Sequence, residues 1–553
     1  MQVAGLLVCF VPSRDYPPNA KKPELLSRRL HIWIALDCNN LLDAKRCTAL
    51  ACSKSVSSFP SIATNETTTE TELRRGLLQL ATQALIPVLF PSNGTKPQDA
   101  EVALKHCLRQ QRNNISVASR KCLSEWILGT SVMKLRYLYV LEQIKQSLVG
   151  SILTGHDAYK TVDATVEALI QLHEQDLCRS HQDDIQIVCW WNNIRMVLSW
   201  PGEDPVERMS VQLSFPYFLC KLLVDQYGIT EAIQLARVSN QPGPITLRRN
   251  YIFHASADVS DDEFCQMLWE NEGVRCIPLT SFPWPGCILL RQKPKSIWAM
   301  QVWKDGWFEV QDSGSQLIVE ATEVKMGDVV VDYCAGNGGK TLAMASRMAR
   351  TTCFLERNEE SAIRARECRC GRIIAHDVVE GRLKQLVGSL ERAGLSMTGL
   401  EGKLFAITVE TTSNANEIDG NMADVVLVDA PCSSTGVLRR RPSQRWELTE
   451  DDVQVNLPKL QLQILSEASQ KVKKQGGRLV YATCSIVKTE NEDVANTFEA
   501  TEEFRSEWEP WPFNDDDWAD TNSHTTGSGG NWRAILPNLH NSDGFFVARW
   551  KRK

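Results

Sequence analysis

Hydrophobic positions follow two different spacings along this chain. From about 72 to 200, apolar residues recur three and four positions apart, as at Leu77, Leu80, Ala81 and Ala84, which predicts helices. From about 306 onward, short β-branched runs alternate with helical stretches, which predicts an α/β domain built on a parallel sheet with helices on both faces. The runs that we expect to form its strands are 328–332, 372–377, 404–409, 423–429, 478–483 and 544–550.

The sequence divides into four expected regions. Residues 1–72 show little periodicity and hold a Ser/Thr-rich stretch, so we expect a variable, partly disordered segment. Residues 73–225 are expected to form an all-α domain, and 226–300 a small α+β linker module. Helices are expected at 217–226 and 230–238, and a strand at 245–248. Residues 301–553 form the C-terminal α/β domain, whose strands should present ligand-binding groups at their carboxyl ends.

Composition narrows the classes of protein that fit. Hydrophobic residues make up 43% and charged residues 23% of the 553 positions, and no apolar run is long enough to span a membrane. The 18 cysteines are not densely spaced and the first residues lack a basic start, so we expect a reducing compartment inside the cell, cytoplasmic or organellar. The net charge of -6 argues against general coating of polyanions. A local basic patch at Arg439, Arg440, Arg441 and Arg445 is the expected contact for nucleic-acid phosphates.

The first motif that carries chemistry is a glycine-rich turn between a predicted strand and a predicted helix. A phosphate-binding P-loop needs a glycine where this chain has a cysteine, so that alternative fails. An acid at the strand end followed by a short glycine turn suits a nucleoside with an amino-acid tail, held by backbone amides at the helix start. The residues of the motif are Asp332, Tyr333, Cys334, Ala335, Gly336, Asn337, Gly338, Gly339, Lys340 and Thr341.

Two further motifs each place a cysteine after a predicted strand. Asp429-Ala-Pro-Cys432 ends one strand, and Thr483-Cys484 ends another. A single cysteine is more often a small buried hydrophobic residue. Two thiols at the ligand-binding edge of one sheet are harder to explain by core packing, and they indicate nucleophilic chemistry.

These motifs together resemble the RNA (cytosine-5) methyltransferases of the Sun/Nop type, closest to the bacterial ribosomal RNA small-subunit methyltransferase B group. The resemblance is strong over 301–553, moderate over 114–248 and absent before that. It implies a Rossmann-like class I methyltransferase domain at the C-terminus and S-adenosyl-L-methionine as cofactor. It also implies an RNA substrate, expected to be ribosomal RNA, docked by the helical N-terminal domain, and we expect a monomer that contacts no membrane.

The resemblance also implies a role for each motif. Cys334–Lys340 would cradle the methionine part of the cofactor, and Asp429 would lie between the cofactor and the target cytosine. Lys340 would lie near the target base. Cys484 would be the nucleophile, and Cys432 would help to expel it after methylation. Carbon 5 of cytosine is a poor nucleophile until a thiolate adds to the neighbouring ring carbon, so this division of labour is chemically sound.

The residues that hold the nucleoside are less clearly marked. By the family pattern Asp377 is preferred for the ribose, with Glu356 as the open alternative and 351–370 as an insertion; Glu410 is the expected residue on the adenine side. Three cysteines of the insertion, Cys353, Cys368 and Cys370, have poor spacing for zinc, so we expect no metal.

Two other functions remain as alternatives. One is a catalytically silent RNA-binding or assembly factor on the same fold. Both cysteines, Asp429 and Lys340 are present, which argues against it. The other is methylation of cytosine in DNA, where the cysteine after proline is normally the nucleophile and the Thr-Cys-Ser cysteine is lacking.

Overall fold

The computed structural model describes residues 68–90, 98–111, 115–149, 162–179, 186–191, 194–252, 259–280, 284–292, 294, 296–355, 370–395, 406–513 and 530–553. The chain forms two compact units, one of 1–77 and 111–124 and the other of 78–110 and 125–553. In the first unit the described residues are mainly the starts of two helices. All of the sheets belong to the second unit. The segment expected to be variable, 1–72, lies almost wholly outside the described residues.

An eight-stranded sheet forms the centre of the C-terminal domain, with the strand order β12-β14-β11-β10-β7-β8-β9 and with β13 paired to β14. The six expected strands are all present, and two short strands are added to them. They are β7 (Val329–Asp332), β8 (Cys370–His376), β9 (Ala406–Thr412), β10 (Val425–Asp429), β11 (Arg478–Thr483), β12 (Trp508–Pro510), β13 (Trp532–Ile535) and β14 (Phe545–Arg552).

The sheet is mixed, which corrects the expectation of a wholly parallel one. Strands β9, β8, β7, β10 and β11 are parallel to their neighbours, but β14 runs antiparallel to β11, and β12 and β13 run antiparallel to β14. An antiparallel strand needs no helical crossover, so the chain can end beside β11. The parallel strands share one carboxyl edge, which brings the ends of β7, β8, β10 and β11 together.

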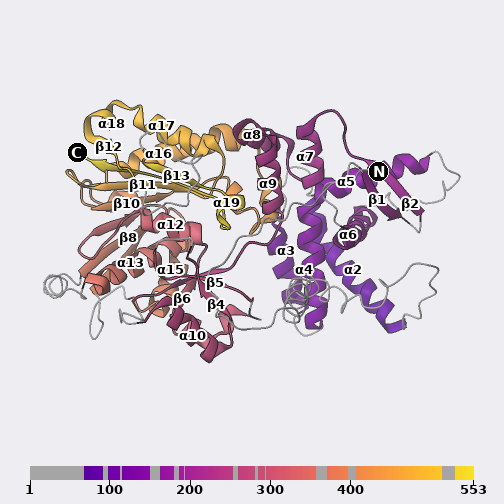
Figure 1. Ribbon diagram of the computed structural model, residues 1–553, viewed down its shortest axis with the longest axis horizontal. Helices are drawn as coiled ribbons and strands as arrows, with labels where there is room; N and C mark the ends of the chain where they lie inside the picture. The colour runs from indigo at the N-terminus through magenta and orange to yellow at the C-terminus, as the bar shows by residue number, and fades with distance from the viewer. Residues whose placement is uncertain are drawn as a thin grey trace, which may run out of the picture. The chain divides into compact units, whose positions relative to one another are not determined.

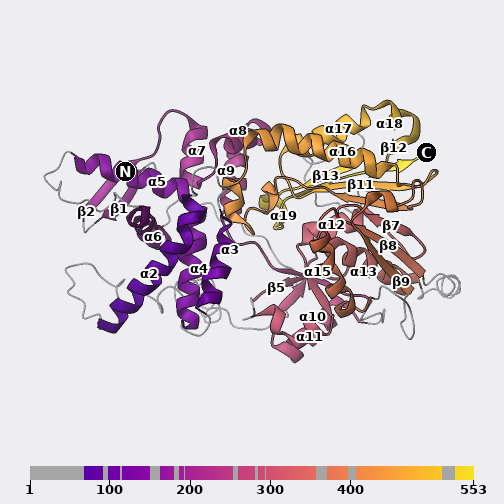
Figure 2. The same cartoon turned by 180° about the vertical axis from the view of Figure 1, so that it is seen from behind.

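Helices cover both faces of this sheet (Figures 1 and 2). One face packs on α12 (Ser313–Ala321), α13 (Gly339–Leu355) and α15 (Glu380–Arg392). The other packs on α16 (Leu457–Ser469), α17 (Glu492–Glu499) and α18 (Glu502–Glu507). Because both faces are covered, the central strands are buried, and Val330, Leu427 and Val480 are each 0% exposed. The doubly covered sheet that the hydrophobic runs predict is therefore confirmed.

The N-terminal region is mainly helical but not all-α. Its helices are α2 (Thr68–Leu89), α3 (Ala100–Gln110), α4 (Val117–Val132), α5 (Lys134–Val149), α6 (Val162–Arg179), α7 (Pro205–Leu213), α8 (Tyr217–Tyr227) and α9 (Ile229–Ser239). Between α6 and α7 an antiparallel hairpin joins β1 (Gln186–Trp191) and β2 (Ile194–Ser199), which the helical spacing did not predict. Among the helices that the structure describes, none has the length and apolar character needed to cross a membrane.

The linker module is a four-stranded sheet in the order β4-β5-β3-β6, with α10 (Asp261–Glu272) packed against it. Its strands are β3 (Thr246–Arg249), β4 (Cys276–Pro278), β5 (Cys287–Leu290) and β6 (Phe308–Val310). Strand β6 lies beyond the expected end of the module at residue 300. Helix α9 packs with α7 and α8 in one core and not with this sheet, although it lies beyond the expected start at 226.

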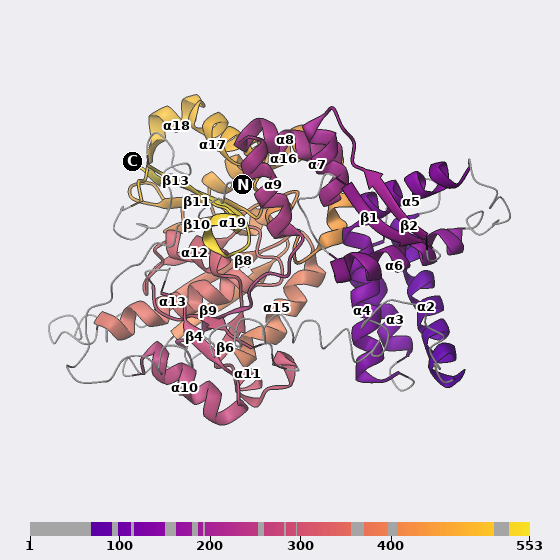
Figure 3. The ribbon, with the colours of Figure 1, turned by 45° about the vertical axis from the view of Figure 1, so that its right-hand side comes forward.

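Helices α8 and α9 also pack against loops of the C-terminal domain. Figure 3 shows α9 beside α19 (Pro537–His540). Apolar residues of α7, α8 and α9 form one buried cluster with Leu438, Val453, Ile486 and Leu536 of the C-terminal domain. The hydroxyl of Tyr227 donates to the carbonyl of Ile486 at 2.8 Å. The loop after β11 is therefore held from the N-terminal side of the chain.

Candidate active site

A cavity of about 790 Å³ opens at the carboxyl edge of the parallel strands. Its lining comes from the loops after β7, β8, β9, β10 and β11 and from α16. This volume lies within the usual range for a small-molecule site, and the edge is where open α/β sheets bind ligands. Of the residues predicted for the site, those that line the cavity are Cys334, Ala335, Gly336, Asn337, Gly339, Lys340, Asp377, Asp429 and Cys484.

The glycine-rich turn after β7 forms one wall of the cavity. Gly336 and Gly338 have φ of 55° and 84°, the left-handed region that glycine adopts without strain. Gly338 is a predicted cofactor contact that does not line the cavity. A Cβ at this position would lie 2.2 Å from Cδ1 of Leu386, so its glycine is needed for close packing on α15. Gly339 begins α13, whose first amides lack partners within the helix and suit an anionic group.

Asp377 follows β8 and closes the turn from the opposite side. Its Oδ2 accepts a hydrogen bond from the amide of Gly336 at 2.9 Å, and its Oδ1 accepts one from the amide of Val379 at 2.8 Å. Arg382 lies 3.7 Å from the same carboxylate and also lines the cavity. Asp377 is therefore fixed at the cavity edge where the family pattern expects the ribose contact. The alternative, Glu356, lies outside the described residues.

Glu410 is not brought to the cavity, which corrects its expected role beside the adenine. It lies within β9 and forms two hydrogen bonds to the guanidinium of Arg372, at 2.8 and 2.9 Å, on an exposed part of the strand. The strand continues to Thr412, three residues beyond the expected end, so the residues that reach the cavity are Ser413, Asn414 and Ala415. Nothing in the sequence spacing alone marked this longer strand.

A lysine and an aspartate face each other inside the cavity. Nζ of Lys340 lies 2.7 Å from Oδ2 of Asp429, and the two side chains are 12% and 29% exposed. Burial disfavours the ammonium charge, but the charge of Asp429 and its hydrogen bond outweigh burial, so the pKa of Lys340 is raised. The ammonium is thus a fixed positive charge at the sheet edge.

The two motif cysteines meet although 52 positions separate them in the sequence. Sγ of Cys432 lies 3.2 Å from Sγ of Cys484, and both are free thiols. The hydroxyl oxygen of Ser434 lies 3.4 Å from Sγ of Cys484. The hydrogen bond from Cys432 lowers the pKa of Cys484 against the opposing effects of burial and the charge of Asp429, and Ser434 and the charge of Lys340 give smaller help. The same hydrogen bond, together with burial, raises the pKa of Cys432 well above that of an ordinary thiol. The pair therefore favours a thiolate on Cys484 and a thiol on Cys432.

A buried acid supports the turn from below the cavity. Asp332 ends β7, is 0% exposed and accepts a hydrogen bond from the hydroxyl of Thr341 at 2.6 Å. Burial raises the pKa of Asp332 to about 7, and the nearby charge of Asp429 adds to the shift. The first turn of α13 is thereby tied to the end of β7.

Most arginines of the expected basic patch contact other residues of the protein, which corrects the prediction that the patch binds nucleic-acid phosphates. Arg445 is 0% exposed; its guanidinium stacks on the ring of Phe215 and donates to the carbonyl of Ser214 at 3.1 Å. Arg439 and Arg440 both form ion pairs with one aspartate, Asp543. Arg441 remains at the cavity wall, where it can meet a phosphate.

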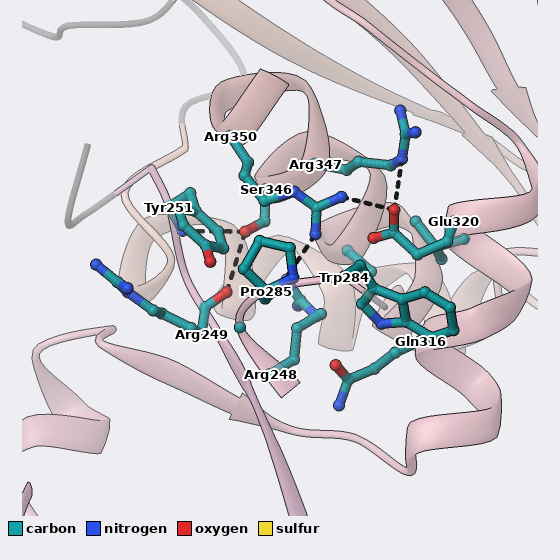
Figure 4. A pocket seen from close by; sticks show the side chains of 13 residues that line it. Arg248, Arg249, Tyr251, Trp284, Pro285, Gln316, Glu320, Ser346, Arg347 and Arg350 are labelled. Atoms are coloured by element: carbon teal, nitrogen blue, oxygen red, sulfur yellow. Dashed lines mark hydrogen bonds and ion pairs between the residues drawn. The ribbon is translucent and has the colours of Figure 1, made fainter. Parts of the chain in front are cut away.

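A second pocket lies where β3, α12 and α13 meet (Figure 4). Oε2 of Glu320 accepts from Arg350 at 2.6 Å and from Arg347 at 2.9 Å, and Arg350 also donates to the carbonyl of Pro285 at 3.2 Å. The space that remains is about 10 Å³, which is the lower limit for one water molecule. These contacts therefore join the linker module to the C-terminal domain and leave no room for a ligand.

The cysteines of the expected insertion give no information on metal binding. Cys368 and the side chains of Cys353 and Cys370 lie outside the described part of the chain. Within the residues that are described, no group of three or more His, Cys, Asp or Glu side chains is arranged to hold a metal ion.

Comparisons with known proteins agree with this geometry. Residues 363–551 match the model of a protein family described as 16S rRNA methyltransferase RsmB/F. The chain is 30% identical over 296 residues to the probable ribosomal RNA small subunit methyltransferase B of Bacillus subtilis, which covers 54% of this chain and 58% of the relative. It is 29% identical over 353 residues to the 28S rRNA (cytosine(4447)-C(5))-methyltransferase of Homo sapiens, covering 62% of this chain and 38% of the human one. The chain thus spans less than two thirds of the length of either relative.

One solved structure is similar over most of the fold. The crystal structure of PH0851 superposes with a TM-score of 0.58 at 21% identity and covers 85% of this chain and 98% of its own. At this identity the likeness concerns the fold alone.

Proposed function

We propose that this chain, whose residues 363–551 match the model of the 16S rRNA methyltransferase RsmB/F family, belongs to that family and methylates carbon 5 of cytosine in RNA. Its relatives are named as ribosomal RNA methyltransferases, one of them for the C5 position of a cytosine, which supports ribosomal RNA as the substrate. The residues of the proposed site all lie in one chain, and we expect the enzyme to act as a monomer. The mainly helical N-terminal region would dock the RNA.

The observation that carries this proposal is the pair of thiols 3.2 Å apart, of which Cys484 lines the cavity and Cys432 lies directly behind it. Methylation of an amine, a hydroxyl or a guanine nitrogen needs no cysteine. Methylation of carbon 5 of cytosine does, because the ring must first accept a nucleophile at carbon 6 before carbon 5 can attack an electrophile. A second thiol beside the first suits a covalent adduct that has to be resolved.

The cavity fits S-adenosyl-L-methionine, which when bound supplies the methyl group as an electrophile. The turn Cys334–Lys340 offers backbone amides to the carboxylate of the methionine part. Asp377 would hold the ribose hydroxyls, and Ser413 and Asn414 lie where the adenine edge would contact the protein. Asp429 would lie between this group and the target base.

The two cysteines differ in protonation state. Cys484, with its lowered pKa, is the thiolate that adds to carbon 6 of the cytosine. Cys432, with its raised pKa, keeps its proton and donates a hydrogen bond to the sulfur of Cys484. After carbon 5 is methylated, its proton leaves to a water molecule, the double bond between carbons 5 and 6 re-forms, and Cys484 departs as a thiolate. The Cys432 thiol stabilises that leaving thiolate.

Lys340 and Asp429 would act on the base without forming covalent bonds. The ammonium of Lys340 is buried except for a narrow exposed part and is held by Asp429 at 2.7 Å. Such a preorganised charge stabilises negative charge that develops on the pyrimidine ring when the thiolate adds.

Labelled S-adenosyl-L-methionine and total RNA test this proposal. Cys484→Ala should abolish methyl transfer, and Cys432→Ala should trap an RNA–protein adduct that survives denaturation. Cys276→Ala, which removes a thiol from the linker module, is the matched control and should behave as wild type. Methyl transfer at the wild-type rate by Cys484→Ala would contradict the nucleophile, and bisulfite sequencing of the RNA would identify the methylated cytosine.

A further inference from the structure

A buried carboxylate joins the two cysteine loops from behind. Glu490 is 0% exposed, and its Oε2 accepts hydrogen bonds from the hydroxyls of Ser433 and of Ser485, the latter at 2.6 Å. Its Oε1 accepts one from the amide of Ser433 at 2.8 Å. Ser433 and Ser485 directly follow the two cysteines in the sequence. The carboxylate of Glu490 therefore forms hydrogen bonds to both loops, at the residue next to each thiol.

Neighbouring polar side chains hold these hydrogen bonds of Glu490 in place. Gln461 donates to Oε1 at 3.0 Å from α16, and the hydroxyl of Thr435 lies 3.0 Å from that of Ser485. Among the described residues, the partners of this carboxylate are neutral donors, with no lysine or arginine paired to it. A buried carboxylate is costly to leave without hydrogen bonds, so the donors are held close to it.

The positions of the two cysteines depend to different degrees on the hydrogen bonds of Glu490. Cys484 follows β11, which is paired with β10 on one side and with β14 on the other. Cys432 lies in an irregular loop, two residues before Ser434, whose φ is 58°. Strand pairing fixes the first cysteine by itself, whereas the second relies on contacts of its loop. Loss of the carboxylate should therefore displace Cys432 more than Cys484.

We infer that Glu490 is a positioning residue that holds the sulfur of Cys432 against that of Cys484 and so sets the rate at which the RNA adduct is released. The inference rests on the proposed function and adds to it a residue that touches neither cofactor nor base. The charge of Glu490 also contributes to the raised pKa of Cys432, after the hydrogen bond to Cys484 and burial. Attack by Cys484 should survive the loss of Glu490, because its own anchoring is in the sheet.

The test compares Glu490→Ala and Glu490→Gln in the full chain with wild type. The RNA–protein adduct is measured on a denaturing gel under single turnover, next to the amount of methyl group transferred. We expect Glu490→Ala to accumulate about tenfold more adduct than wild type while methyl transfer in the first turnover is largely kept. Glu490→Gln keeps the shape and one acceptor oxygen, so it should accumulate an intermediate amount. If the alanine variant does not fold, the glutamine variant decides.

Two controls separate this inference from a general loss of structure and from the proposed function. Glu492→Gln changes a carboxyl group two residues further on, at the start of α17, and should leave adduct release unchanged. Release at the wild-type rate by folded Glu490 variants, or an equal loss of attack and release, overturns the inference. The proposed function then still stands if Cys432→Ala traps the adduct. If Cys432→Ala traps no RNA–protein adduct, Cys432 has no role in release, and the inference on Glu490 is then wrong as well.

Discussion

Replacing Asp332 by asparagine should stabilise the protein at alkaline pH. In the folded chain this carboxyl is 0% exposed, and burial raises its pKa from an ordinary 3.8 to about 7. The folded state therefore binds a proton more tightly than the unfolded state does, and this stabilising contribution is lost as the pH rises from about 4 through about 7. The difference between the two pKa values corresponds to about 4 kcal/mol of folding stability, of which about 2 to 3 kcal/mol is lost between pH 5 and pH 8.

Asparagine keeps the acceptor for the hydroxyl of Thr341 and removes the ionisation. Because the unit that unfolds is large and its unfolding entropy is correspondingly large, the melting temperature of Asp332→Asn relative to wild type should rise by about 2 to 4 °C between pH 5 and pH 8. Differential scanning calorimetry of both proteins at the two pH values gives this double difference, in which the titration of groups that do not interact with Asp332 cancels. Two melting temperatures that move in parallel would refute the raised pKa of Asp332.

Asp328 offers a control with the opposite sign on the same segment of chain. It lies just before β7, where its carboxylate pairs with Arg478 at 2.6 Å, and both side chains are largely buried. Asp328→Asn breaks this pair and leaves a buried guanidinium without its partner, which should cost on the order of 3 kcal/mol at both pH values. The same chemical change thus stabilises at one end of the strand and destabilises at the other.

Three further outcomes test the site. Gly338→Ala should lower the free energy of unfolding by about 2 to 4 kcal/mol, because a Cβ at φ 84° would clash with a leucine of α15. The control is Gly339→Ala, whose Cβ would meet no atom within 4 Å, so this variant should keep the wild-type melting temperature. Alkylation of Cys484 by iodoacetamide at pH 7, followed by peptide mass spectrometry, should slow about tenfold in Cys432→Ala, because the hydrogen bond that lowers the pKa of Cys484 is gone; an unchanged rate would contradict the coupling. Glu410→Gln removes only an exposed ion pair and should leave cofactor affinity unchanged and stability within about 1 kcal/mol, so a large loss of affinity would restore its expected role.

The strands and the chemistry at their ends could be predicted from the sequence for one physical reason. Strands that are buried on both faces need continuous apolar runs, and such runs are visible without any knowledge of the fold. Because parallel strands share a carboxyl edge, the runs that end at Asp429 and Thr483 predict that the cysteines after them lie near each other. The structure puts their sulfur atoms 3.2 Å apart.

What the sequence could not predict depends on partners far away along the chain. Arg445 resembles a surface cation until its distant acceptors are known. Two of its acceptors, the carbonyl of Ser214 and the side chain of Asn240, lie more than 200 positions earlier. The direction of β14 is hidden for a similar reason, since its apolar run reads the same in either orientation. The predicted end of β9 was three residues too early, which moved the expected contact from Ser413 to Glu410.

The cluster that α7, α8 and α9 form with the loops near Leu438 and Ile486 has a consequence for how the chain can be divided. A fragment that begins at 301 would contain the whole predicted methyltransferase domain, yet it would expose the apolar side of those loops to water. It would also lose the hydrogen bond from Tyr227 to the loop that follows Cys484, the proposed nucleophile. Limited proteolysis should therefore release no soluble, active C-terminal piece, and the smallest autonomous catalytic body should begin before α7.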